Sequence, residues 1–417
     1  MIIREPQLLK IVQTIGRCAD RQGLKVFLVG GVVRDILLQK KNLDLDIVVE
    51  GDALAFVRTL MKSLKGEIKI YPQFGTATLT LSYGRIDFSS ARKEIYPEPG
   101  VLPRVERGTL YEDLFRRDFT INAIAISINA DQFGTLVDPF QGLKDLKEGK
   151  IRILHEKSFI DDGTRILRAI RFEQRFGFKI ERGTSQLLKR ALATGLVLNV
   201  HPHRYFSEVR KMFKEPSPTQ CFLRLKQLGG FKLIRPRLTI HFSLMRSVEK
   251  KIRQRSLKSH QKTILYVAAL FKNVSVKNLP SLLKTFPFLK EEREALIQSR
   301  QWENIQRQLS RKILKPSDVY CLLKPFDDAV IIYGSLMTSN PVVLQRLNRF
   351  LSKDRFIQLE LRGKDLEKMG FSQGKEMGEA LKKILWKKLD GELRNKKEEF
   401  RFAKAMKPSI DRIKIVE

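Results

Sequence analysis

The stretch VFLVGGVVRDILL, Val26–Leu38, together with LDLDIVV, Leu43–Val49, decides the fold of the N-terminal part of this chain. The first run is apolar and rich in β-branched residues up to its glycine pair. It predicts a buried strand that stops at Gly31 and a helix that begins at Val32. The second run predicts a neighbouring strand, and the amphipathic segment around Leu8–Gln22 predicts a helix before both.

The segments that follow extend this sheet. Ala53–Leu64 is expected to be helical, and FGTATLTLSYGRIDFSS, Phe74–Ser90, alternates apolar and polar residues about Gly84, as a β-hairpin does. From Ser158 onward apolar residues recur at helical spacing, for example in ILRAIRFEQRF, Ile166–Phe176. The predicted fold class is α+β, with a small mixed-sheet head followed by a long, mostly helical remainder.

The charge of the chain is distributed unevenly. The 417 residues carry a formal net charge of +33, of which +3 falls on residues 1–150 and +30 on residues 151–417. Thermophilic proteins are often rich in lysine, but such solvated faces do not explain an imbalance of this size. The basic part therefore predicts a polyanionic partner, with nucleic acid as the first hypothesis.

Cysteine usage and hydropathy exclude several classes of protein. Cys18, Cys221 and Cys321 lie far apart in no metal-ligand spacing, which predicts neither a disulfide framework nor a zinc site. No run of 18 apolar residues occurs, and the first ten residues lack the apolar core of a signal peptide. We expect a soluble, cytoplasmic protein that does not associate with membranes.

Three weak signals in the head gain meaning from their order: Gly30-Gly31, then Arg34-Asp35, then Asp44-x-Asp46. Taken singly, the glycines can mark only a tight turn, and the carboxylates can lie on a solvated strand face. In this order, backbone N–H groups can approach a triphosphate, and two carboxylates can hold Mg²⁺. With Asp87 as a third carboxylate from a neighbouring strand, the layout suits in-line nucleotidyl transfer.

Ordered motifs give the chain a recognisable resemblance. The two opening stretches are followed by RRDFTINAIA, DPFQGLKDL, DDGTRILRAIRF and RYFSEVRKMF, which begin at Arg116, Asp138, Asp161 and Arg204. This series resembles the class II tRNA nucleotidyltransferases of the polymerase-β superfamily. That family includes CCA-adding, CC-adding and A-adding enzymes and bacterial poly(A) polymerases.

The resemblance is dense from about residue 25 to 215. Beyond that it depends on helical character and on the segment Gly363–Leu385. It implies a division into a nucleotidyltransferase catalytic head (1–150), a helical neck with a nucleotide-selecting motif (151–215), an RNA-binding helical body (216–340) and a tRNA-binding helical tail (341–417).

The resemblance also implies roles for residues of the head. Asp44 and Asp46 would be the catalytic Mg²⁺ ligands, and whether Asp87 also binds metal stays open. The groups that would contact the triphosphate or the incoming nucleotide are Gly30, Gly31, Arg34, Arg117, Asp118 and Asn122. The residues between them, Phe119, Ile121 and Ala123, are expected to fill the core, and Asp138 and Asp145 to order the linking segment.

The DDGTR segment would select the base. Asp162 and Arg165 are three residues apart and are expected on one helix face. An acceptor beside a donor matches the edges of cytosine and adenine, whereas uracil and guanine present the reversed order. The alternative is that Asp161 and Asp162 are ordinary carboxylates at a helix N-terminus. The family often has Glu where this chain has Asp161, and commonly Pro where it has Gly163.

Four further residues are expected near this motif. Arg168 and Arg171 would bind the nucleotide, either through its phosphates or by contacting the motif carboxylates. Arg204 and Glu208 would support the site, or would form only an i, i+4 ion pair on a helix surface.

Basic residues of the C-terminal part are candidates for contact with tRNA phosphates. Residues 201–300 contain 22 Lys and Arg against six acidic residues. A solvated helix face is the alternative for this cluster, and Gly363 and Gly374 are expected near helix starts in the tail. The RNA-binding candidates are Lys250, Lys251, Arg253, Arg255, Lys258, Lys364 and Lys375.

The implied reaction is attack of a tRNA 3′-hydroxyl on the α-phosphate of CTP or ATP, with release of pyrophosphate and no template. Complete CCA addition and addition of the terminal A alone stay open. The segment Ala91–Leu114 occupies the place of the element that family members use when switching from C to A, and its length disfavours a CC-adding enzyme. A bacterial poly(A) polymerase and a nonenzymatic RNA-binding protein are further alternatives. Some members of the subgroup carry long N-terminal extensions, so a shortened form of a longer protein is also open.

Overall fold

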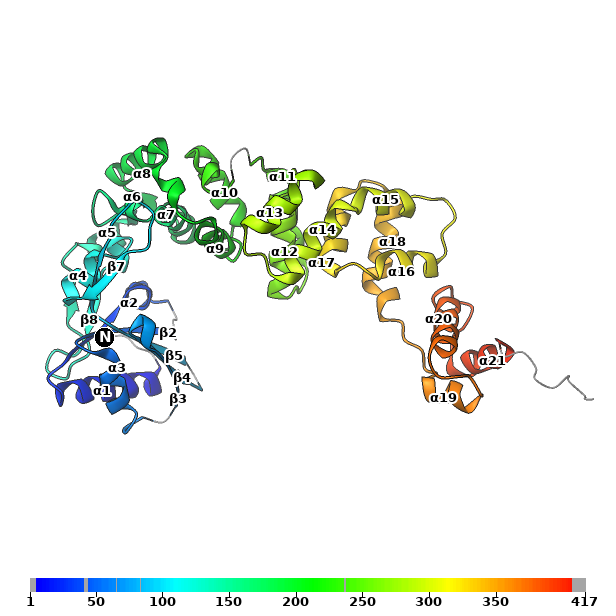
Figure 1. Cartoon of the computed structure of the whole chain (residues 1–417), viewed down its shortest axis with the longest axis horizontal. Helices are drawn as coiled ribbons and strands as arrows, with labels where there is room; N and C mark the ends of the chain where they lie inside the picture. The colour runs from blue at the N-terminus through cyan, green and yellow to red at the C-terminus, as the bar shows by residue number, and fades with distance from the viewer. Residues whose placement is uncertain (1–4, 41–43, 65, 83, 236–237, 407–417) are drawn as a thin grey trace, which may run out of the picture. The chain divides into compact units, whose positions relative to one another are not determined.

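The structure is a computed structural model that describes residues 5–40, 44–64, 66–82, 84–235 and 238–406. It consists of two compact units, Met1–Leu238 and Thr239–Glu417 (Figure 1). This division is coarser than the four parts expected from the sequence, which stay a prediction. Leu43, the expected first residue of the second strand, lies outside the described residues.

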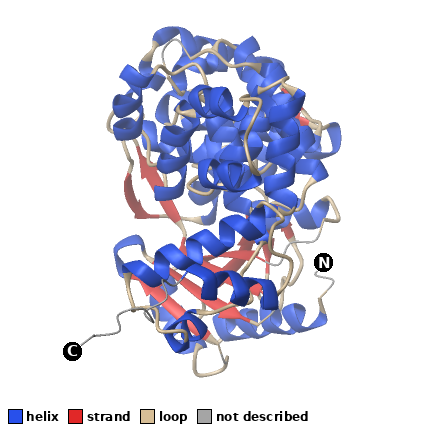
Figure 2. Cartoon of the chain, turned by 90° about the vertical axis from the view of Figure 1, so that its right-hand side faces the viewer, coloured by secondary structure: helices blue, strands red, loops and turns tan. Residues whose placement is uncertain are grey.

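The N-terminal unit contains a seven-stranded mixed sheet with the strand order β3-β4-β5-β2-β1-β8-β9 (Figure 2). β2 and β5 pair in parallel. The other neighbours in this sheet are antiparallel. The strands are β1 (Lys25–Val29), β2 (Asp44–Glu50), β3 (Glu67–Tyr71), β4 (Thr76–Leu81), β5 (Gly84–Ser90), β8 (Ala125–Ser127) and β9 (Leu136–Val137).

Helices and two small sheets complete this unit. The hairpin β6 (Arg92–Ile95) and β7 (Arg104–Arg107) is antiparallel, whereas β10 (Lys150–Ile151) and β11 (Lys179–Ile180) pair in parallel. The helices are α1 (Pro6–Asp20), α2 (Gly31–Leu37), α3 (Ala53–Leu60), α4 (Leu110–Phe115), α5 (Gly142–Glu148), α6 (Ser158–Asp161), α7 (Thr164–Phe176), α8 (Arg182–Thr194), α9 (Pro202–Met212) and α10 (Pro218–Gln227).

Strand alternation places the β2 carboxylates away from the main core. Leu45, Ile47 and Val49 are buried in one cluster with apolar residues of α1 and α3. Because side chains alternate along a strand, Asp44 and Asp46 project from the opposite face of the sheet, where Val48 packs with residues of α4. The fold thus buries one face of β2 and leaves its acidic residues available for chemistry.

Helix α1 packs closely against the sheet because of one glycine. Its buried residues Leu8, Val12, Ile15 and Ala19 recur at the three- and four-residue spacing of one helix face. A Cβ atom on Gly16 would lie 1.8 Å from the Ile128 carbonyl oxygen, so a larger residue there would push the helix off the sheet.

The C-terminal unit is helical throughout its described part. Two apolar clusters lie within it, one centred on Trp302, Leu323 and Leu347 and the other on Leu366 and Ile384. The helices are α11 (Phe242–Gln254), α12 (Ser259–Leu270), α13 (Leu279–Thr285), α14 (Lys290–Arg300), α15 (Trp302–Leu309), α16 (Pro316–Leu323), α17 (Asp328–Met337), α18 (Pro341–Ser352), α19 (Gly363–Lys368), α20 (Lys375–Leu389) and α21 (Lys396–Met406).

The α+β class and the expected strands and hairpin are confirmed, with two differences. The helix expected over Ala53–Leu64 ends at Leu60, and the alternating segment Glu67–Tyr71 forms an additional strand at the edge of the sheet. None of the helices in the described ranges is long and apolar enough to cross a membrane.

Candidate functional site

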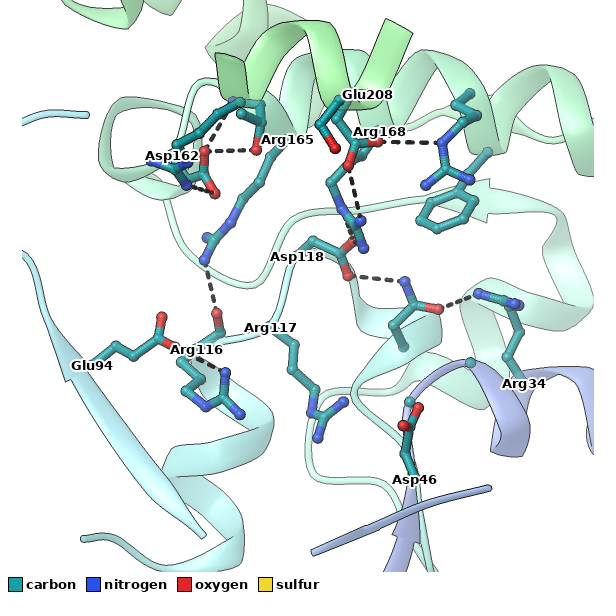
Figure 3. Close-up of a pocket in the computed structure, with 18 of the residues that line it drawn as sticks. Arg34, Asp46, Glu94, Arg116, Arg117, Asp118, Asp162, Arg165, Arg168 and Glu208 are labelled. Atoms are coloured by element: carbon teal, nitrogen blue, oxygen red, sulfur yellow. Dashed lines mark hydrogen bonds and ion pairs between the residues drawn. The ribbon is translucent and has the colours of Figure 1, made fainter. Parts of the chain in front are cut away.

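A cavity of about 670 Å³ in the N-terminal unit gathers most of the residues singled out in the sequence (Figure 3). They come from the turn between β1 and α2, from β2, from the segment after α4, and from α7 and α9. Asp44, Asp87 and Asp161 are not part of its lining. The predicted residues that line the cavity are Gly30, Gly31, Arg34, Asp46, Arg117, Asp118, Asn122, Asp162, Arg165, Arg168, Arg171, Arg204 and Glu208.

Three carboxylates approach one another across β2 and β5. Asp46 lies opposite Asp87 in the parallel register, with Asp44 two residues earlier on the same face. Burial raises the pKa of Asp46; Arg117 opposes this shift, and the carboxylates of Asp87 and Asp44 add to it. The Asp87 oxygens already bind the Thr78 hydroxyl at 2.6 Å and the Arg85 guanidinium at 2.8 Å.

These carboxylates can hold a cation only together with other ligands. No group of three or more His, Cys, Asp or Glu residues in the described part of the chain has the geometry of a metal site. Mg²⁺, however, is usually held by one or two carboxylates plus substrate phosphates. Asp44 and Asp46 fit that donor set, and a cation would offset the burial and the neighbouring carboxylates that raise the pKa of Asp46.

The backbone conformation and the close approach of Arg117 both require glycine at position 30. Its φ of +73° lies in the left-handed region, and an added Cβ would be 2.7 Å from a terminal nitrogen of Arg117. The same Cβ would be 3.9 Å from Asp46 Oδ2. The Arg117 guanidinium therefore lies directly against the glycine turn and close to the β2 carboxylate.

A chain of hydrogen bonds, buried except at its Arg168 end, joins Arg34 to Arg168. Arg34 donates to Asn122 Oδ1 at 2.6 Å, and the Asn122 amide donates to Asp118 Oδ1 at 2.9 Å. Arg168 Nε donates to Asp118 Oδ2 at 2.8 Å. Burial by itself raises the pKa of Asp118, but the ion pair with Arg168 and the bond from Asn122 outweigh it and leave the pKa lowered. As expected, Phe119, Ile121 and Ala123 fill the core between these residues.

The ion pairs of Arg204 and Glu208 on α9 differ from the i, i+4 pair that was considered for them. Glu208 is buried rather than on a surface, and its oxygens lie 3.5 Å from Arg168 and 3.4 Å from Arg171. Arg204 instead binds Asp162 at 2.8 Å, so the i, i+4 alternative for Arg204 and Glu208 is wrong for the ion pairs that the structure describes. Arg168 pairs with Asp118 and Arg171 with Glu208, both of which lie outside the DDGTR motif, and contact of either arginine with phosphates stays a prediction.

The DDGTR motif differs from the expected helix face. Asp162 has extended backbone between α6 and α7, so it does not lie on a helix. Its Oδ1 accepts from the Thr164 backbone N–H at 3.0 Å and from the Thr164 hydroxyl at 2.7 Å. The motif therefore brings Asp162 and Arg165 to one cavity by a helix start rather than by helical periodicity.

Arg165 is anchored on two sides. One terminal nitrogen donates to the Ser158 hydroxyl at 2.6 Å, and the other donates to the Arg116 carbonyl at 2.8 Å. A Cβ on Gly163 would lie 2.2 Å from the Tyr205 hydroxyl, so glycine rather than proline fits beside this tyrosine. Asp161 lies outside the cavity lining, 3.8 Å from a ring nitrogen of His155.

Several cavity residues were not predicted. Glu94 and Tyr96 come from the β6–β7 hairpin region, and Arg116 follows α4. Arg116 and Arg117 both pair with buried Asp113, which stands three and four residues before them. That i, i+3 and i, i+4 spacing was a signal that could have revealed Asp113.

The basic candidates of the C-terminal unit lie at helix ends. Lys250, Arg253 and Lys258 are exposed, whereas Lys251 and Arg255 are half-buried. Lys364 and Lys375 are exposed in the first turns of α19 and α20, and Gly363 and Gly374 stand at the starts of these helices as expected. Nothing in this arrangement tests RNA binding, so these assignments stay predictions.

Known proteins are similar to this chain in sequence and in fold. Residues 26–152 match the family model of the poly A polymerase head domain, and residues 177–240 match that of the probable RNA and SrmB-binding site of polymerase A. An A-adding tRNA nucleotidyltransferase of Geobacter sulfurreducens is 34% identical over 407 residues, covering 94% of this chain and 46% of the relative. One from Halalkalibacterium halodurans is 43% identical over 226 residues, covering 53% and 52%. The chain thus spans about half the length of the curated relatives it matches.

Solved structures resemble the chain over nearly its whole length. A CCA-adding enzyme in an apo form is 34% identical with a TM-score of 0.75, and 96% of each chain is covered. A Thermotoga maritima CCA-adding enzyme complexed with tRNA is 33% identical with a TM-score of 0.72 and the same coverage. A related CCA-adding enzyme has been solved with ATP, at 32% identity and a TM-score of 0.74, covering 96% of each chain.

Proposed function

Because this chain belongs to the class II tRNA nucleotidyltransferase family, we propose that it adds nucleotides from ATP and CTP to the 3′ end of tRNA without a template. The observation that carries the proposal is that one cavity is lined both by Asp46 and by Asp162 with Arg165. A carboxylate suited to a metal-bound triphosphate and a pair suited to a base edge thus face the same space.

Phosphate binding is assigned to the head. Asp44 and Asp46 would hold Mg²⁺, which when bound lowers the pKa of the attacking hydroxyl and neutralises charge on pyrophosphate. Arg117 lies between the glycine turn and Asp46, where a guanidinium can bind phosphate oxygens. Arg34, Asp118, Asn122 and Arg168 fix the wall on which the ribose and triphosphate would lie.

Base selection is assigned to the start of α7. Asp162 presents only acceptors and Arg165 only donors, which matches cytosine and adenine and mismatches uracil and guanine. Arg204 holds Asp162 Oδ2, while Ser158 and the Arg116 carbonyl hold Arg165. Because a guanidinium has five N–H donors, these anchors leave donors of Arg165 for a base.

The proposed partner is tRNA that lacks all or part of its 3′ CCA. The similarity of this chain to an enzyme complexed with tRNA supports this assignment, as does the net charge of +33. A CC-adding enzyme and a poly(A) polymerase I are also among the relatives. Relatives named A-adding and structures named CCA-adding favour CCA or the terminal A as the product. Addition of A to a tRNA that ends in CC is common to both.

Three tRNAs that end before CCA, after C and after CC test the proposal, each incubated with labelled CTP or ATP and Mg²⁺. Incorporation of one A on the CC-ending tRNA is expected in every case. CTP incorporation on the two shorter tRNAs identifies CCA addition, and its absence identifies A addition. Long A tracts on unrelated RNA would instead indicate a poly(A) polymerase, and no incorporation on any tRNA would overturn the proposal.

A further inference from the structure

Asp113 on α4 is fully buried between two consecutive arginines that line the cavity. Its Oδ1 accepts from Arg116 Nη2 at 2.7 Å and from Arg116 Nε at 3.0 Å. Its Oδ2 accepts from Arg117 Nη2 at 2.7 Å. Each oxygen of the carboxylate thus holds a different guanidinium. Without it, two like charges would lie next to each other in a partly dry site.

The ion pair of Asp113 with Arg116 connects it to the base-selecting side of the cavity. Arg116 also binds Glu94 of the β6–β7 hairpin at 2.9 Å, so its guanidinium group is held between Asp113 and Glu94. The carbonyl of the same residue accepts from Arg165 at 2.8 Å, a contact drawn in Figure 3. Anchoring of the Arg116 side chain therefore fixes the backbone on which Arg165 is supported.

The ion pair of Asp113 with Arg117 connects it to the phosphate-binding side of the cavity. Figure 3 shows the Arg117 side chain extending toward Asp46. A terminal nitrogen of Arg117 lies where Gly30 leaves room, 2.7 Å from the position that a Cβ atom there would take, and that position is 3.9 Å from Asp46 Oδ2. Among the described residues, the ion pair of Arg117 is the one with Asp113, so its guanidinium depends on Asp113 for its position.

We infer that Asp113 is a positioning residue that sets Arg117 beside Asp46 and, through Arg116, sets Arg165 beside the base. The inference rests on the proposed nucleotidyl transfer, which it deepens by linking phosphate binding and base selection to one carboxylate. Asp113 does not touch the substrate. It acts only through the two arginines. Its removal should therefore change both the KM for ATP and the nucleotide preference, whereas a defect at one arginine should change mainly one of them.

Asp113→Asn tests this with a side chain of nearly the same shape and no charge. The KM for ATP is expected to rise, and the preference for ATP over GTP and UTP to fall, each by about tenfold or more. Glu173→Gln is the matched control. Glu173 is a buried carboxylate that binds Arg224 at 2.7 and 3.1 Å but does not line the cavity. A purely structural effect would lower the melting temperature of both variants and leave nucleotide preference unchanged in both.

Two conservative variants distinguish the contributions of Arg116 and Arg117, and they still test the inference if Asp113→Asn is unstable. Arg117→Lys should raise the KM for ATP with little change in preference, since it alters only the phosphate side. Arg116→Lys should lower the preference with a smaller change in KM. Unchanged KM and unchanged preference in a folded Asp113→Asn protein would overturn the inference, as would identical defects in the two lysine variants.

Equilibrium binding of ATP, GTP and UTP without RNA distinguishes failure of this inference from failure of the proposed function. If the wild-type chain binds ATP selectively but transfers nothing to tRNA, the proposed function fails. The inference still predicts weaker and less selective ATP binding by Asp113→Asn. If transfer occurs and both binding properties are unaffected by the substitution, only the inference fails.

Discussion

Asp46 on β2 lies directly opposite Asp87 on the parallel strand β5. The two carboxylates differ in their surroundings: Asp87 is bound by Thr78 and Arg85, whereas the pKa of Asp46 is raised mainly by burial. The cavity is therefore lined by the carboxylate whose negative charge is less well compensated. A site in this state is suited to accept a cation together with its anionic substrate.

Asp46→Asn is expected to lower nucleotide transfer by more than about a hundredfold, because it removes a proposed metal ligand rather than a group behind one. tRNA binding should change little. Single-turnover transfer with labelled ATP and a CC-ending tRNA measures the effect. Asp87→Asn is the comparison, with a smaller loss expected. Equal losses would place both carboxylates on the metal, and retained transfer in Asp46→Asn would contradict the assignment.

The same substitution should change how stability depends on pH. Since the folded-state pKa of Asp46 lies above its unfolded value, this group favours the folded state most below the unfolded pKa, and that contribution is lost as pH rises through the folded pKa. At neutral pH without Mg²⁺, Asp46→Asn should therefore be at least as stable as wild type. Chemical denaturation at pH 7, with and without Mg²⁺, tests this, and a clear destabilisation would be the contrary result.

Asp118→Ala is expected to destabilise the N-terminal unit by about 2–4 kcal/mol, because it removes a buried carboxylate and leaves the half-buried Arg168 guanidinium without its main partner. The pKa of Asp118 is lowered, so its contribution to stability is present above the unfolded pKa and is lost as pH falls through the folded pKa. Urea denaturation followed by circular dichroism at pH 7 and pH 3 measures both effects. A destabilisation that is equally large at pH 3 would contradict the electrostatic explanation.

His155 is expected to titrate far below an ordinary histidine. Burial, Arg165 and Lys157 lower its pKa to about 4, so the ring is neutral at pH 7. The contribution of neutral His155 to the free energy of unfolding is present above the unfolded pKa of about 6.5. It is lost as pH falls toward 4, by roughly 3 kcal/mol in all. NMR titration of the ring protons measures the pKa directly. His155→Gln should flatten the stability curve over this pH range, and a ring that titrates near 6.5 would disprove the prediction.

Replacement of the basic residues near the end of α11 and the start of α12 should weaken the electrostatic part of RNA binding. Neutralising Lys250, Arg253 and Lys258 is expected to reduce the slope of log affinity against log salt by about 0.7–0.9 for each phosphate that the protein no longer neutralises. Filter binding of tRNA between about 50 and 200 mM salt provides the measurement. An unchanged slope would show that these lysines and this arginine form only a solvated helix face.

The order of motifs in the sequence was sufficient to predict the mixed-sheet head, the helical remainder and the family. Periodicity determined the strands and helices because β2 alternates buried and acidic residues and because the later helices repeat their apolar positions every three or four residues. The family followed from the resemblance of the ordered motifs. The same alternation put Asp44 and Asp46 on one face. The resemblance directed attention to Asp162 and Arg165, and their chemistry as acceptor and donor supported their pairing.

Only the tertiary structure decided which charges meet. Arg204 binds Asp162 across 42 positions of sequence rather than Glu208 four residues away, and Arg168 binds Asp118 across 50. Asp113 pairs with Arg116 and Arg117 at local spacing, but Arg116 meets Glu94 and Arg165 only after the hairpin, α4 and α7 have packed together. Ion pairs act over a few ångströms in space, and local sequence spacing cannot specify a distance that the fold creates.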